Sequence, residues 1–125
     1  MVFPSTSVLT MDNSGARRVK CIKVYKKPGR GKAVVGDLLK VIVVKLRNRG
    51  LIRVKRGEIH IAVLTRSSTQ VFRSKKGYFI KFDSNTVVML TKKNLPIGTR
   101  LFGPCSEELR NRKFNRILTL CTNIV

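Results

Sequence analysis

The chain has 125 residues, enough to bury the core of one domain without metals or disulfides, and its 42% hydrophobic content excludes intrinsic disorder. Its 27 Lys and Arg residues against 6 Asp and Glu give a formal net charge of +21, which opposes compaction unless counter-charge is supplied. Because phosphate is the commonest supplier, this imbalance favours a nucleic-acid-binding protein over a soluble domain with an unusually basic face.

The first ten residues lack the basic segment and long apolar run of a secretory signal, and they are not an Arg-rich transit peptide. The longest apolar run, residues 41–44 with Leu38 and Leu39 nearby, is too short to span a bilayer. We therefore expect no membrane insertion. We also expect a chain that works where it is made, or one whose targeting segment has been removed.

A turn at residues 12–15 leads directly into a strongly basic strand. Asp, Asn and Ser side chains hydrogen-bond their own backbone and Gly15 can adopt a positive φ, so this segment predicts a tight turn. The strand that follows has no acid, and its apolar parity changes near Cys21, which predicts a β-bulge. Its four cations are Arg17, Arg18, Lys20 and Lys23. We expect these cations to be held on a stiff support for a polyanion.

Short Val- and Ile-rich runs separated by Gly, Asn and basic turns predict a mainly β chain, as a barrel or a sandwich. The expected strands are residues 8–11, 18–25, 38–45, 59–66, 78–82, 87–91 and 99–102. The nearly continuous apolar run at 38–44 predicts a strand covered on both faces. Within 59–64, odd-numbered residues should face one way and even-numbered residues the other. Within 78–82, Tyr78, Ile80 and Phe82 should face inward, and Phe79 and Lys81 outward.

Fifteen of the 27 cations lie in two blocks that contain no acid, residues 13–36 and 38–57, separated only by Asp37. Inside them, residues 26–32 and 47–50 predict exposed basic loops, whose Gly and Pro let the backbone follow a phosphate surface. The residues that we expect to contact RNA are Asn13, Ser14, Arg17, Arg18, Lys20, Lys23, Lys26, Lys27, Arg30, Lys32, Lys45, Arg47, Arg49, Arg53, Lys55, Arg56, Lys75 and Lys76.

The end of the chain has a different character. Ser106 stands where an N-cap would, ahead of Glu107 and Glu108, which predicts a short helix with acids in its first turn. Asn111 could cap a second short helix or turn that runs through residues 114–118. We therefore expect a single domain over residues 1–125, with a barrel at about 1–103 and a helical tail at about 104–125.

Catalytic and metal chemistry find little support. Cys21, Cys105 and Cys121 have no close pair and no zinc spacing, so we expect three reduced thiols, no disulfide and a reducing compartment. The single histidine, His60, has no Cys or acid at a suggestive spacing, and Glu107 and Glu108 suit capping better than acid–base work. We expect no metal, no cofactor and no enzymatic activity. A basic ribonuclease would lack its acid–base pair.

One alternative is a free-standing single-strand binder or RNA chaperone on a small barrel. Residues 78–82 could form a base-stacking platform with Phe79 as its outward ring. With no Trp, 2 Tyr and 6 Phe, however, most rings are needed for the core, so we expect stacking to be minor. Binding should then depend on phosphate contacts and on shape, which suits folded RNA.

Several separated blocks together are typical of one family. They are residues 12–19, 21–24, 35–37, 54–58, 82–85 with 87–88, 96–104, 108–110 and 113–114. Over nearly its whole length the chain resembles the bacterial-type L-fourteen family of large-subunit ribosomal proteins. The resemblance implies a small closed five-stranded β-barrel with a projecting β-ribbon and short C-terminal helices.

The resemblance also implies a structural constituent of the large ribosomal subunit that binds large-subunit ribosomal RNA and supports translation. It implies contacts with neighbouring ribosomal proteins, and with small-subunit RNA across the subunit interface. Members of the family offer a surface to a ribosome-silencing factor, and the matching positions here are Thr99, Arg100 and Lys113.

The chain departs from the family in two segments. The usual Asp-Gly turn of a hairpin is replaced by residues 75–77, which places Lys75 and Lys76 at its tip, and residues 25–33 differ from common bacterial members. These extra cations and the three cysteines favour a mitochondrial member that works in the mitochondrial matrix, in the mitochondrial ribosome. The alternative is a protein of the bacterial cytoplasm.

Overall fold

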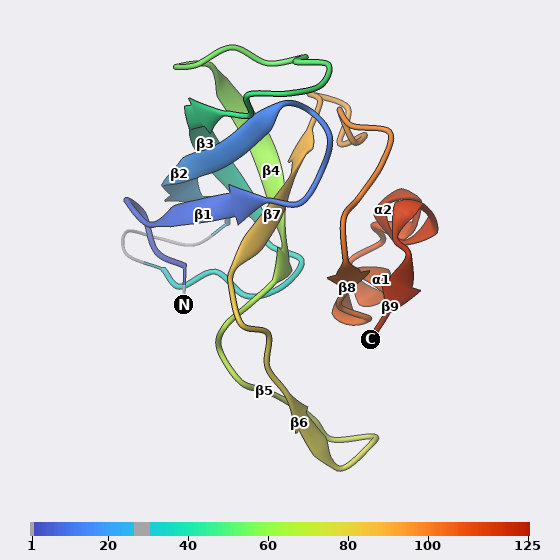
Figure 1. Cartoon of the computed structure of the whole chain (residues 1–125). Helices are drawn as coiled ribbons and strands as arrows, with labels where there is room; N and C mark the ends of the chain where they lie inside the picture. Colours follow the sequence, from blue (N-terminus) through green and yellow to red (C-terminus); the bar gives the residue numbers. More distant parts are fainter. Residues whose placement is uncertain (1, 27–30) are drawn as a thin grey trace.

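The computed structural model describes residues 2–26 and 31–125, so Lys27 and Arg30, two expected RNA contacts, lie outside the described residues. A closed barrel is formed by β1 (Ser7–Thr10), β2 (Ala16–Val24), β3 (Leu38–Leu46), β4 (Ile59–Arg66) and β7 (Thr86–Leu90) (Figure 1). Neighbouring strands are antiparallel except β1 and β7, which close the barrel in parallel. The expected mainly β fold with a five-stranded barrel is confirmed.

The hairpin of β5 (Val71–Arg73) and β6 (Tyr78–Ile80) leaves the barrel between β4 and β7 and projects away from it (Figure 1). After β7 the chain runs to β8 (Pro104–Cys105), α1 (Glu108–Asn111), α2 (Asn115–Leu120) and β9 (Asn123–Ile124), and β8 pairs with β9 in parallel. The projecting ribbon and the short C-terminal helices are therefore confirmed. No helix in the described part of the chain is long and apolar enough to cross a membrane.

Two apolar cores share the barrel wall. The barrel interior contains buried side chains such as Leu39, Leu64 and Met89. A second core forms where the tail, through residues such as Leu109 and Ile117, covers the outer side of β4 and β7. All five residues of β7 are buried because both of its faces are covered. The same arrangement confirms the parity expected for 59–64, since Ala62 and Leu64 lie in the first core and Ile61 and Val63 in the second.

The expectation for β3 was wrong. Its odd-numbered residues Leu39, Val41 and Val43 are buried in the barrel, whereas Lys40 is half-buried and Val44 is 39% exposed. The apolar run therefore has one covered face, because the tail reaches only the start of β3, at Leu38. The bulge expected near Cys21 is confirmed by a register shift between Cys21 and Lys23.

Two further expectations need correction. Residues 99–102 form no strand, since only a single bridge joins Leu101 to Asp12. In 78–82, Phe79 is exposed as expected, but Tyr78 is also 46% exposed rather than inward. Both segments lie outside the barrel sheet. Alternation along such a segment does not predict which side chains are buried, because neither of its faces packs on the barrel core.

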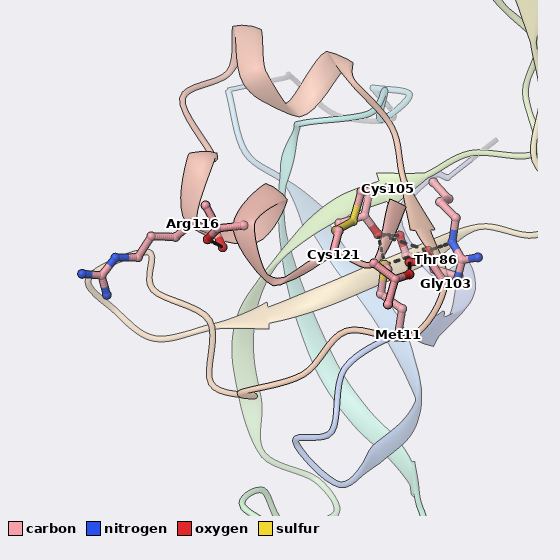
Figure 2. Close-up of a disulfide and its surroundings, with 10 residues drawn as sticks. Met11, Thr86, Gly103, Cys105, Arg116 and Cys121 are labelled. Atoms are coloured by element: carbon pink, nitrogen blue, oxygen red, sulfur yellow. Dashed lines mark hydrogen bonds between the residues drawn. A yellow bond between two sulfur atoms is a disulfide. The ribbon is translucent and has the colours of Figure 1, made fainter. Parts of the chain in front are cut away.

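A disulfide joins Cys105 to Cys121, with Cα atoms 6.2 Å apart, so the expectation of three reduced thiols was wrong (Figure 2). The two residues are 16 positions apart in sequence, but β8 and the end of α2 bring them together on the second core. Cys21 is a free thiol buried in the barrel, as expected, and burial raises its pKa. Cysteine usage therefore no longer supports a reducing compartment.

We expect this disulfide to contribute about 3 kcal/mol to the free energy of unfolding, because it closes a loop of roughly 15 residues in the unfolded chain. Guanidinium unfolding of the wild type with and without dithiothreitol should show that difference. The double variant Cys105→Ser/Cys121→Ser should have the lower stability in both conditions. Equal stability of the wild type with and without reductant would contradict the prediction.

Candidate RNA-binding surface

The turn before β2 is anchored by a buried carboxylate. Asp12 Oδ1 accepts hydrogen bonds from the Ser14 hydroxyl (2.7 Å) and the Ser14 N–H (3.4 Å), and Oδ2 accepts one from the Met89 N–H of β7 (3.0 Å). Burial raises the pKa of Asp12 above its ordinary value. Gly15 has φ +100°, and a Cβ there would lie 2.8 Å from the Ile52 Cα, so the turn requires glycine. The start of β2 is therefore held by the Asp12 hydrogen bonds and by the close packing of Gly15 against Ile52.

Asn13 and Ser14, both expected RNA contacts, have their side-chain polar groups engaged inside the protein. The Asn13 Oδ1 accepts hydrogen bonds from the backbone N–H of Thr99 (2.8 Å) and of Arg100 (3.1 Å), and its amide nitrogen donates to the Thr99 hydroxyl (3.1 Å). Ser14 is buried against Asp12. These two side chains position the turn and the loop at residues 97–100.

The outer face of β2 and β3 carries like charges directly opposite each other. Arg18 pairs with Lys45, and Lys23 pairs with Lys40, in the register of the two strands. Directly opposed residues of an antiparallel pair project to the same side, where like charges destabilise the sheet. Arg17, Arg18, Lys20, Lys23 and Lys45 are exposed. This face is therefore built at an electrostatic cost to the free protein.

Most acidic residues are engaged elsewhere, and only the exposed Asp83 lines the same surface hollow as Arg18 among the residues that the structure describes. Asp12 and Asp37 are buried, and Glu58 bonds to His60 (2.7 Å), which lowers the pKa of Glu58. His60 therefore has an acidic neighbour, Glu58, two residues away along the chain, which its sequence spacing did not suggest. Within residues 2–26 and 31–125, the ion pairs found involve Arg73, Lys76, Arg112 and His60, and none involves a cation of β2, β3 or residues 47–56.

The basic loop at residues 47–56 is partly anchored. The Arg47 guanidinium lies over the Phe102 ring, 5.2 Å from its centroid, and Arg53 Nη1 donates to the Ile97 carbonyl (2.8 Å). Arg49, Lys55 and Arg56 remain exposed. Loop and strand cations therefore border each other, since the loop directly follows β3. Lys26 is exposed and Lys32 half-buried on the other expected loop.

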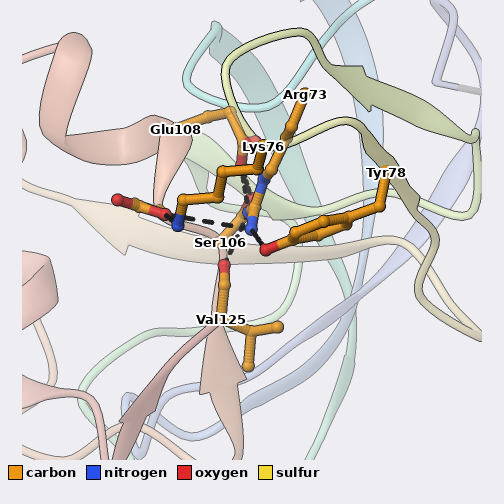
Figure 3. A network of polar contacts seen from close by, with 7 residues as sticks. Arg73, Lys76, Tyr78, Ser106, Glu108 and Val125 are labelled. Atoms are coloured by element: carbon orange, nitrogen blue, oxygen red, sulfur yellow. Dashed lines mark hydrogen bonds and ion pairs between the residues drawn. The ribbon is translucent and has the colours of Figure 1, made fainter.

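The hairpin is tied to the tail by ion pairs (Figure 3). Arg73 Nε and Nη2 donate to the two carboxylate oxygens of Glu108 (2.7 and 3.0 Å), and Nη2 also donates to the Val125 carbonyl (2.6 Å). Lys76 Nζ donates to Glu107 (2.7 Å), which lowers the pKa of Glu107 and raises that of Lys76. We call this network the hairpin clamp. Sequence patterns could not reveal it, because 35 residues separate Arg73 from Glu108.

The hairpin clamp changes the interpretation of three residues. Glu108 lies in the first turn of α1 as expected, but Ser106 bonds to the Glu108 carboxylate and provides no side-chain cap to the helix backbone. Lys76, an expected RNA contact, has an acidic partner, whereas Lys75 is exposed at the tip.

The residues expected to meet a protein partner lie on two segments. Thr99 and Arg100 are exposed on the loop that Asn13 holds. Lys113 is exposed in the connection between α1 and α2, where its φ of 65° turns the chain.

A closed barrel with a strongly basic outer face, a basic loop beside it and most of its acids used in internal contacts defines a structural RNA-binding protein of the ribonucleoprotein class. Comparison with protein-family models assigns residues 1–125 to Ribosomal protein L14p/L23e. The chain belongs to this family. It is a structural component of the large ribosomal subunit that binds ribosomal RNA, and it is not an enzyme. The alternative of a free-standing single-strand binder is thereby set aside.

Proposed function

We propose that the outer face of β2 and β3, together with residues 47–56, forms the main ribosomal RNA contact of this chain. The observation that carries the proposal is the pair of like-charge oppositions, Arg18 with Lys45 and Lys23 with Lys40. A fold gains nothing from such pairs alone, whereas phosphates placed between them turn repulsion into attraction. Lys26 and Lys32, the described cations of residues 26–32, are proposed as further RNA contacts.

Neutralising the basic loop tests this surface. Arg49→Gln/Arg56→Gln is expected to lower the slope of log affinity for large-subunit ribosomal RNA against log salt by about 1.4 to 1.8, the value for two lost phosphate contacts. The matched control is Lys92→Gln/Lys93→Gln, which removes two exposed cations from another turn. Filter binding at four salt concentrations measures both slopes. Equal slopes for the two variants would remove residues 47–56 from the contact.

We further propose that this protein works in a mitochondrial ribosome. Its charge and its Lys75–Lys76 tip, which departs from the family pattern, support that assignment. Small-subunit RNA and a ribosome-silencing factor are the proposed partners across the subunit interface, with Thr99, Arg100 and Lys113 as the protein-contact residues. Gradient sedimentation of mitochondrial lysate tests the compartment. Absence of the chain from the mitochondrial large-subunit peak would favour the bacterial cytoplasm.

A further inference from the structure

The β5–β6 hairpin has one anchored side and one open side. The hairpin clamp holds the anchored side through Arg73, whose side chain is only 8% exposed, and Ile80 is half-buried. On the open side, Phe72 and Phe79 are directly opposed in the strand register and are 55% and 60% exposed. Their ring centroids lie 4.8 Å apart with the planes inclined by 44°. The molecule thus presents two contacting aromatic rings on a fixed support.

Neither ring serves the folded core. Phe72 and Phe79 belong to neither of the two buried clusters, and more than half of each side chain meets solvent. Clustered exposed aromatics on a soluble protein commonly mark a binding surface. Composition predicts that most rings are needed for the core, and these two rings depart from that prediction.

The charges around the rings favour an anionic ligand with flat, stackable groups. Lys81, directly after β6 and two residues beyond Phe79, is exposed, and Lys75 is exposed at the hairpin tip. The nearby acids Glu107 and Glu108 are already engaged by Lys76 and Arg73. An aromatic platform with cations beside it is the arrangement by which proteins hold unpaired bases and their flanking phosphates.

We propose that Phe72 and Phe79 form a stacking platform for one unpaired base of ribosomal RNA. Because the two rings already touch, the base does not insert between them. It stacks on the outer face of one ring, and Lys75 and Lys81 contact the adjoining phosphates. This contact deepens the proposed RNA-binding function and depends on it, since the basic face of β2 and β3 brings the chain to the RNA.

The test separates stacking from charge. Phe72→Leu/Phe79→Leu keeps apolar side chains and removes both rings. Its affinity for protein-free large-subunit ribosomal RNA is expected to fall by about 5- to 140-fold at every salt concentration, the range for one lost base stack, with the salt slope unchanged. Phe3→Leu, which removes an exposed ring from the N-terminal segment, is the matched control and should bind like the wild type. Thermal unfolding checks that the double variant is folded.

Photochemical crosslinking of assembled large subunits adds a direct readout. Irradiation at short wavelength, followed by mass spectrometry, should find a nucleotide attached at Phe72 or Phe79. Unchanged affinity of the double variant overturns the proposal. So does an amine crosslink from Lys75 or Lys81 to another ribosomal protein with no nucleotide adduct on either ring, because a protein segment then covers the hairpin. Failure of the basic-face proposal would instead appear as an unchanged salt slope when the four opposed cations of β2 and β3 are replaced, in the variant Arg18→Gln/Lys23→Gln/Lys40→Gln/Lys45→Gln.

Discussion

Replacing the four opposed cations of β2 and β3 by Gln is expected to weaken RNA binding and, at the same time, to stabilise the free chain. The variant is Arg18→Gln/Lys23→Gln/Lys40→Gln/Lys45→Gln. Removing two like-charge oppositions should raise the free energy of unfolding by about 0.5 to 2 kcal/mol at low salt. The salt slope of ribosomal RNA binding should fall by about 2.8 to 3.6 if all four contact phosphates.

Urea unfolding and filter binding, each at low and high salt, measure the two effects. The stability gain should shrink at high salt because screening already weakens the repulsion in the wild type. A variant that keeps the charge, Lys23→Arg/Lys40→Arg/Lys45→Arg, is the control and should show neither effect. A loss of stability with unchanged RNA affinity would mean that these side chains serve the barrel and not the RNA.

Replacing Asp12 by Ala is expected to lower the free energy of unfolding by about 3 kcal/mol or more, because several buried donors lose one shared acceptor. The change leaves the Met89 N–H and the Ser14 groups without their acceptor inside the protein, and each buried unsatisfied donor costs about 1 to 3 kcal/mol. Asp12→Asn keeps one acceptor oxygen and should lose less. Urea unfolding at neutral pH measures both.

The pH dependence distinguishes the charge of Asp12 from its hydrogen bonds. Burial raises the pKa of Asp12 in the folded state, so the folded chain holds this proton more tightly than the unfolded chain. The stabilising effect of protonation is complete below the unfolded pKa and is lost as the pH rises through the folded pKa. The difference in free energy of unfolding between the wild type and Asp12→Asn should therefore change with pH between the unfolded and folded pKa values of Asp12. A constant difference from about pH 4 to pH 7 would contradict the raised pKa.

Local patterns in the sequence predicted much of the barrel because each depends on near neighbours. The parity change at Cys21 indicated a bulge, and the alternation in residues 59–64 identified the two sides of β4. Both leave a mark in the alternation of apolar residues along one strand, which can be seen without knowing the distant partners. The turn at residues 12–15 was predicted for the same reason.

The failures all involve distant partners. Nothing near Cys105 indicates that the end of α2 returns to it, and nothing near Arg73 indicates a carboxylate 35 residues later. The prediction for the apolar run of β3 was wrong because the length of the tail, not the run itself, decides which strands are covered twice. Asn13 and Ser14 remain predicted RNA contacts, and their side-chain polar groups also bond to the turn itself and to the loop at residues 97–100.

The seam between β1 and β7 has a consequence for synthesis. It pairs Leu9 with Thr86 and Thr10 with Val87, so the barrel cannot close until most of the chain has left the ribosome that makes it. Pairing across such a separation is slow, and until it forms the edges of β1 and β4 are open to other strands. A chain truncated before Thr86 should therefore aggregate rather than hold its cations in register. Completion of the seam therefore requires synthesis of the chain at least through Val87.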